Sequence, residues 1–114
     1  MSNKSFEEQI AELKKISPDL SLAQEGGYSY ILIPNLALPD HCTPKSVDVL
    51  LCPVPRDGYQ SRLFFAQQIT GGPARNWNGN IRVLSKNWHA VSWKVNAGLS
   101  LVDMLLIHLS ALRP

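Results

Sequence analysis

The stretch 101–112, LVDMLLIHLSAL, limits most strongly how this chain can fold. Apolar residues recur in it at helical spacing, and Met104 and Ile107 lie off that stripe, so the predicted helix is apolar almost all round. Such a helix is usually buried on several sides. The stripe consists of Val102, Leu105, Leu106, Leu109 and Leu112. Ser100 supplies a capping oxygen and Asp103 a first-turn negative charge, so we predict that the helix begins just after Ser100.

A second helix is predicted near the N-terminus. The pattern Ser5-Phe-Glu-Glu8 is a capping box, and apolar residues then recur on one face, before Pro18 ends the helix. That face consists of Phe6, Ile10, Leu13 and Ile16. The charged residues of the same segment lie on the other side, which predicts an amphipathic helix.

The segment between the helices predicts about four strands. The first contains Leu20 and Leu22, Gly26-Gly27 forms a hairpin turn, and the other strands are expected at 28–33, 47–54 and 62–67. We interpret 34–44, with its three prolines, as an ordered loop, and Asn78-Gly79 as a tight turn in a long connection to the last helix. Sequential strands with short turns and helices at both ends predict an α+β fold, in which an antiparallel four-stranded meander lies between an N-terminal and a C-terminal helix.

Length and composition set further limits. A chain of 114 residues is expected to form a single domain over 1–114. A net charge of +2 is too small to require a polyanionic partner. The polar start of the chain and the absence of a long apolar run predict a cytoplasmic protein without a membrane partner. Cys42 and Cys52 form neither a metal motif nor a disulfide framework, and three scattered histidines give no metal-ligand spacing, so neither a metal nor a cofactor is expected.

Several short motifs resemble bacterial ubiquitin-conjugating-enzyme-like proteins, the prokaryotic family E of that superfamily. They are Ser46-Val-Asp-Val-Leu-Leu51, Gly58-Tyr59, Leu63-Phe-Phe65, Gly71-Gly-Pro73, Ser85-Lys-Asn-Trp-His89 and Trp93 before the Leu-rich helix. Gly58-Tyr59 lacks the proline that usually follows in the family. The resemblance covers about residues 30–112 and implies a ubiquitin-conjugating fold truncated after its central helix.

The same resemblance places Arg82 where conjugating enzymes carry their catalytic Cys. A guanidinium cannot form a thioester, so the usual transthiolation is excluded at that position. Two other sources of chemistry stay open. His89 is a candidate general base toward Ser85, and Cys42, in a polar loop, is a candidate thiol nucleophile. A hydrogen-bonded structural role is the alternative for His89, and His108, on the apolar helix, is expected to be structural.

The resemblance also indicates partners. In the family the first helix commonly contacts the activating enzyme, so Phe6 and Ile10 with Lys14 and Lys15 are expected to form a docking face. Trp88 and Trp93 are candidate partner-binding aromatics, since Trp is favoured in interfaces as well as in cores. The cations near the tryptophans are too few and too dispersed to predict nucleic-acid binding.

The sequence therefore leads to two hypotheses. The first is a component of a bacterial ubiquitin-like conjugation pathway that lacks the catalytic Cys and binds a ubiquitin-like protein or an activating-enzyme-like protein. The alternative is an unconventional acyl transferase that uses Ser85 and His89, or Cys42. Whether the chain is an enzyme stays open between them.

Overall fold

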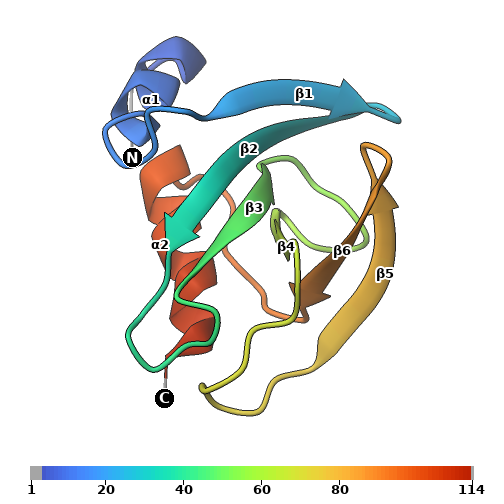
Figure 1. Ribbon diagram of the computed structural model, residues 1–114. Helices are drawn as coiled ribbons and strands as arrows, with labels where there is room; N and C mark the ends of the chain where they lie inside the picture. The colour runs from blue at the N-terminus through green and yellow to red at the C-terminus, as the bar shows by residue number, and fades with distance from the viewer. Residues whose placement is uncertain (1–3, 114) are drawn as a thin grey trace.

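The computed structural model describes residues 4–113; residues 1–3, part of the polar start from which a cytoplasmic location was predicted, and Pro114 lie outside this range. The fold is α+β, as predicted: two helices cover one face of a curled antiparallel sheet (Figure 1). The elements are α1 (Phe6–Leu13), β1 (Ser21–Glu25), β2 (Tyr28–Ala37), β3 (Ser46–Cys52), β4 (Arg62–Phe65), β5 (Trp77–Val83), β6 (Lys86–Val91), α2 (Leu101–Leu109) and a 3-10 turn, η1 (Ser110–Leu112). The sheet has six strands in the order β1-β2-β3-β4-β6-β5, where the sequence predicted four. Within residues 4–113, no helix has the length and apolar character needed to cross a bilayer.

Both helices begin where the sequence predicted. The Ser5 hydroxyl accepts a hydrogen bond from the Glu8 amide and the Glu8 carboxylate accepts one from the Ser5 amide, which confirms the capping box. The Ser100 hydroxyl accepts the Asp103 amide at 3.2 Å. The predicted apolar face of α1 is too long, because the helix ends at Leu13 and Ile16 is 46% exposed beyond it.

The loop predicted for 34–44 begins later than expected, because β2 continues to Ala37. The pairing of β2 with β3 shifts register between Ile33 and Leu36, and Asn35 adopts a positive φ of 50° there. The Asp48 carboxylate accepts the Asn35 amide at 2.9 Å, so a side chain replaces the backbone partner that the irregularity removes. A bulge of this kind lets Pro34 lie inside a strand.

The long connection predicted after β4 is wrong, because it contains the β5–β6 hairpin. Asn78-Gly79 makes no hairpin turn: it lies within β5, where the pairing with β6 shifts register between Asn78 and Ile81. The chain reverses instead at Leu84 and Ser85, whose φ values are 50° and 66°. Neither residue is one that favours positive φ, so the turn carries no signal in the sequence.

This turn gives a stability prediction. Ser85→Gly is expected to raise the free energy of unfolding by about 1 kcal/mol, because glycine adopts φ of +66° without the steric cost that serine has there. Urea denaturation at neutral pH measures the change. The matched control is Lys86→Gly, one residue later in β6, which is expected to lower stability. Equal changes in the two variants would contradict the turn geometry.

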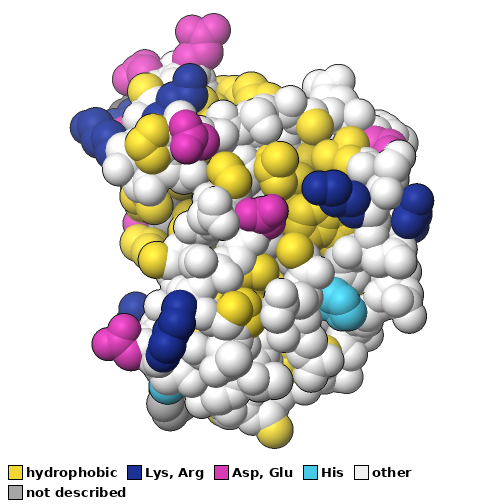
Figure 2. All heavy atoms as spheres, viewed as in Figure 1, with side chains coloured by type: hydrophobic (Ala, Val, Ile, Leu, Met, Phe, Trp, Pro, Cys, Tyr) yellow, Lys and Arg dark blue, Asp and Glu magenta, His cyan; other side chains and the backbone are white. Residues whose placement is uncertain are grey.

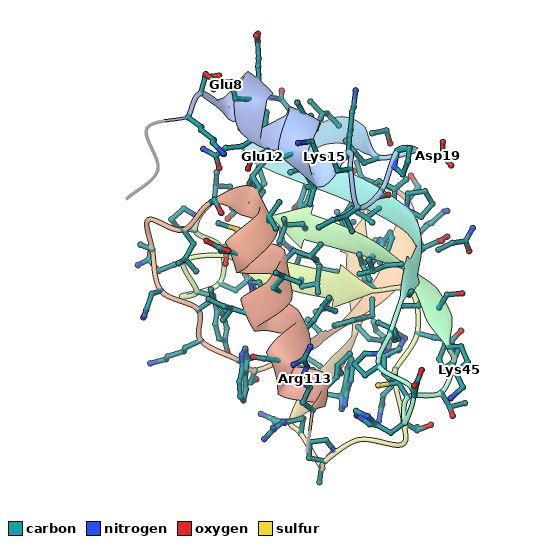
Figure 3. All side chains as sticks on the ribbon, turned by 90° about the vertical axis from the view of Figure 1, so that its left-hand side faces the viewer. Glu8, Glu12, Lys15, Asp19, Lys45 and Arg113 are labelled. Carbon is teal, nitrogen blue, oxygen red and sulfur yellow. The ribbon has the colours of Figure 1, made fainter. Side chains whose placement is uncertain are left out.

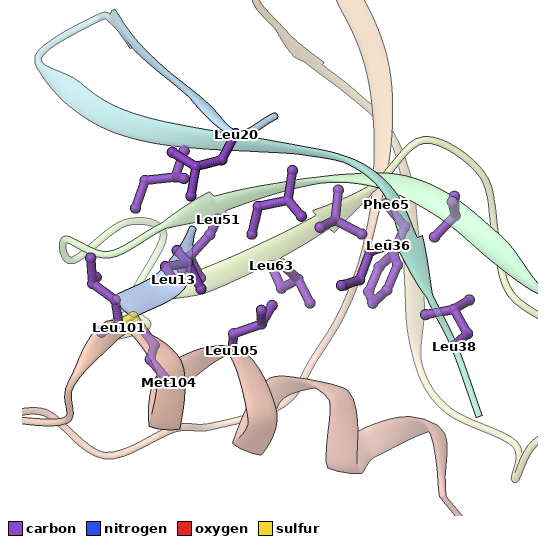
Figure 4. Close-up of a cluster of buried hydrophobic side chains, with 14 of the residues drawn as sticks. Leu13, Leu20, Leu36, Leu38, Leu51, Leu63, Phe65, Leu101, Met104 and Leu105 are labelled. Atoms are coloured by element: carbon purple, nitrogen blue, oxygen red, sulfur yellow. The ribbon is translucent and has the colours of Figure 1, made fainter. Parts of the chain in front are cut away.

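The main core lies between the helices and the sheet (Figure 4). Leu13 of α1, Leu105 of α2 and Ile33 of β2 are fully buried in it. Burial of apolar area in this layer is the main source of stability for both helices, since each is short. The layer also fixes α1 and α2 against each other.

A second cluster fills the concave side of the sheet. Tyr30, Phe64 and Trp88 are its largest members, and the Trp88 indole donates a hydrogen bond to the Val83 carbonyl at 3.0 Å. The sheet curls until the tip of the β1–β2 hairpin meets that of the β5–β6 hairpin, where the Leu84 amide donates to the Glu25 carboxylate at 3.1 Å. Figure 2 shows hydrophobic side chains gathered in the hollow between these hairpins. The sheet thus encloses its second core by curvature, without a helix on that side.

Candidate functional site

Neither cysteine is accessible for covalent chemistry in this structure. Cys42 and Cys52 are both 0% exposed, and burial raises the pKa of each thiol above its ordinary value. The prediction of Cys42 as a reactive loop thiol is wrong. Its loop packs closely on the 70–72 segment, where Thr43 and Thr70 exchange backbone hydrogen bonds of 2.8 and 2.9 Å, so a polar sequence is folded over a buried side chain.

The predicted pair of Ser85 and His89 is spread along one hairpin. Ser85 occupies the turn and His89 lies on β6, four residues further along an extended chain. At the rise of a strand this separates the two Cα atoms by about 13 Å, which is beyond direct hydrogen bonding of the side chains. The His89 imidazole lies instead against the backbone of β5, where a Cβ added at Gly79 would come within 3.0 Å of Nδ1. Gly79 therefore makes room for the ring.

Arg82 lies on β5, at the free edge of the sheet. Its guanidinium is exposed and donates to the Asn87 side-chain oxygen across the hairpin at 3.4 Å. The whole of β6 and the segment 92–100 separate it in sequence from the start of α2. Arg82 thus offers a cation to solvent from an edge strand.

Two of the predicted docking residues are inside the protein. Ile10 is 9% exposed and belongs to the main core, and Trp88 is 3% exposed in the concave cluster, so neither contacts a partner in this conformation. Both predictions are wrong because helical spacing and residue type do not tell a core face from a docking face. Trp93 is half-buried, and the Arg75 guanidinium stacks 4.8 Å from the centre of its ring.

Phe6, Lys14 and Lys15 do remain on the surface. Phe6 is 49% exposed and Leu22, on the edge strand β1, is 56% exposed. Both line a groove of about 400 Å³ that Ile31 and Pro53 complete. The groove lies between α1 and the β1–β2 hairpin, and its walls are mainly apolar. Of the predicted docking residues, Phe6 thus contributes to an apolar recess.

A buried polar pair was not found by sequence reasoning. Ser61, just before β4, is hydrogen-bonded through Oγ to Nε2 of His108 on α2 at 2.8 Å, and the residues are 1% and 6% exposed. Burial, with a smaller contribution from nearby Arg62, lowers the pKa of His108 from 6.5 to about 4. The structural role expected for His108 is therefore confirmed: its neutral imidazole joins α2 to the sheet. The partner lies 47 residues away in sequence, so no local pattern indicates it.

Arg62 is buried beside this pair on β4. Its guanidinium stacks 4.4 Å from the Tyr59 ring centre, and Nη1 lies 3.6 Å from the half-exposed Asp57 carboxylate. Burial lowers the pKa of Arg62, and Nη2 has no hydrogen-bond partner within residues 4–113. The interaction with Tyr59 and Asp57 offsets the cost of burying this cation.

The described residues thus offer binding surfaces more than reactive groups. Across residues 4–113, His, Cys, Asp and Glu side chains nowhere gather in a set of three that could hold a metal ion. Comparison of the chain with protein-family models, with curated proteins and with solved structures finds no match.

Proposed function

We propose that this protein is a component of a bacterial ubiquitin-like conjugation pathway, with a conjugating-enzyme-like fold that binds partners and has no catalytic thiol. The proposal rests on the motif resemblance and agrees with the order of the elements: a first helix, four strands in sequential antiparallel contact, and a late helix on the same face of the sheet. The β5–β6 hairpin, which carries Arg82 and His89, lies in sequence between the fourth strand and the late helix.

The complete burial of both thiols is the main observation in favour of a protein without a catalytic thiol. A transthiolating enzyme needs a thiolate that a partner's thioester can reach. Cys42 and Cys52 are 0% exposed with raised pKa values, which disfavours the thiolate and blocks access. Arg82, at the position that the resemblance gives to the nucleophile, is an exposed cation on a strand.

The groove between α1 and β1 is the docking site in this proposal, and an activating-enzyme-like protein is its occupant. Phe6 and Leu22 expose apolar area at its rim, and Lys14 and Lys15 place two cations at the end of α1. A partner with an apolar anchor and acidic residues near it is complementary to this surface. The first helix has the same role in the family that the motifs resemble.

Phe6→Ala and Leu22→Ser are each expected to weaken binding of the activating-enzyme-like protein by about tenfold, since each removes exposed apolar area that the groove offers to the partner. The probes are the adenylating enzyme and the ubiquitin-like protein encoded nearest to this chain, and calorimetry measures their affinities. The matched control is Leu106→Ser, which removes an equally exposed apolar side chain from α2. Absence of binding to both probes would contradict the pathway, and equal loss in the control would contradict the site.

The transferase alternative is tested in the same samples. Incubation with the adenylating enzyme, the ubiquitin-like protein and ATP is expected to give no covalent adduct on this chain. An adduct that is cleaved by reductant and lost in Cys42→Ala, or cleaved by hydroxylamine and lost in Ser85→Ala, would overturn the non-catalytic reading.

A further inference from the structure

The outer face of α2 is uncovered although its sequence is apolar almost all round. Leu101, Met104, Leu105 and His108 point into the core, whereas Leu106 is 51% exposed and Ile107 38% exposed on the opposite side. Figure 3 shows α2 facing the viewer with no other element in front of it. An apolar helix face of this kind is commonly covered by a partner.

Three residues define the centre of that face. Asp103, Leu106 and Ser110 follow one another at spacings of three and four, which places them in one row along the helix. Arg113 continues past the end of the row and lies beside Leu106 and Leu109, with which it lines a groove of about 630 Å³. The face therefore carries an acid in its first turn, a leucine in its middle, a small residue at its C-cap and, beyond the helix, the cation of Arg113, which Figure 3 shows at the lower end of α2.

This arrangement is complementary to itself when reversed. Suppose that a second α2 packs antiparallel to the first and that the two-fold axis relating them passes at the height of His108. Leu106 of each copy then lies opposite Ser110 of the other, and the small serine leaves room for the leucine. The same axis sets Asp103 of each copy opposite Arg113 of the other. The apolar contact and the ion pair thus form in the same register of the two helices. The antiparallel arrangement also aligns the helix dipoles favourably.

We propose that the outer face of α2 is a homodimer interface, in which two copies of this chain pack their α2 helices antiparallel around Leu106 and close the ends with two Asp103–Arg113 ion pairs. The groove that Leu38, Pro39 and His41 form beside Leu106 and Leu109 is then covered by the partner helix. This surface is separate from the α1–β1 groove, so the dimer does not depend on the proposed function.

Sedimentation equilibrium of the full chain tests the interface. The wild-type protein is expected to dimerise with a micromolar dissociation constant. Leu106→Glu is expected to weaken the dimer at least ~30-fold, because symmetry places two carboxylates in the apolar centre. The matched control, Leu22→Glu, introduces the same charge at an equally exposed leucine on β1 and is expected to leave the dimer unchanged.

Charge exchange tests the register. Asp103→Arg and Arg113→Asp alone are each expected to weaken dimerisation by about tenfold through like-charge contacts at both ends. The double variant restores the opposite charges and is expected to recover most of the affinity. A monomeric wild-type protein at high concentration would overturn the interface, and failure of the double variant to recover would overturn the antiparallel register.

Discussion

Acidification from pH 7 to pH 4 is expected to reduce the free energy of unfolding by about 3 kcal/mol through His108 alone. Its pKa in the folded protein is about 4, against an ordinary value of 6.5, because the imidazole is buried between α2 and the start of β4. The unfolded chain therefore takes up the proton first as the pH falls. The contribution is fully present above pH 6.5 and is lost between pH 6.5 and pH 4.

Urea denaturation of the wild type and of His108→Gln at several pH values measures this effect. The glutamine removes the titrating group and retains a polar atom for Ser61, so the difference between the two proteins separates His108 from the carboxylates that also titrate. The wild type is expected to lose about 3 kcal/mol more than the variant between pH 7 and pH 4. His89→Gln, which removes an imidazole from outside the core, is the matched control. Parallel profiles for the wild type and His108→Gln would show that His108 is accessible to protons in the folded state.

Gly71→Ala is expected to lower the free energy of unfolding by about 3 kcal/mol. Gly71 has a φ of 90°, which an L side chain rarely adopts, and a Cβ there would lie 2.0 Å from the backbone oxygen of His41. The backbone of the 41–43 loop must therefore move. The two hydrogen bonds between Thr43 and Thr70 would be lost with that movement, at about 1 kcal/mol each, in addition to about 1 kcal/mol for the backbone conformation itself.

Gly58→Ala separates these contributions, because Gly58 has a φ of 84° and no atom within 4 Å of an added Cβ. It is expected to cost about 1 kcal/mol, so the difference of about 2 kcal/mol between the variants measures the close approach alone. Urea denaturation at neutral pH gives both values. Equal losses of unfolding free energy in the two variants would show that the backbone at His41 can move away from a Cβ at position 71 without destabilising the protein.

The sequence predicted those elements whose signals are local. Side-chain caps at Ser5 and Ser100 determined where both helices begin, and Gly26-Gly27, both with positive φ, determined the first hairpin. The β5–β6 hairpin was missed because Asn78-Gly79, a dipeptide typical of turns, lies at an irregularity inside strand β5. Tertiary packing holds Leu84 and Ser85 in a turn that their own preferences do not indicate.

The candidate site was predicted less well, because burial depends on contacts between distant segments. Cys42 is hidden by the approach of its loop to the 70–72 segment, and the partner of His108 comes from another element of the fold. The periodicity of α1 indicated an apolar face, but it could not predict that Ile10 on this face is buried whereas Phe6 is exposed. That division is set by the length of the helix and by the position of the β1–β2 hairpin.

The link between Glu25 and Leu84 has a consequence for how the protein resists misassembly. β1 and β5 are the two outermost strands, and unpaired strand margins are the usual templates for aggregation. Because the sheet curls until the ends of these two edge strands meet, each edge strand shields part of the other from neighbouring molecules. Replacement of Glu25 by a residue that cannot accept the Leu84 amide would release that end of both margins, and intermolecular β-pairing would then begin there.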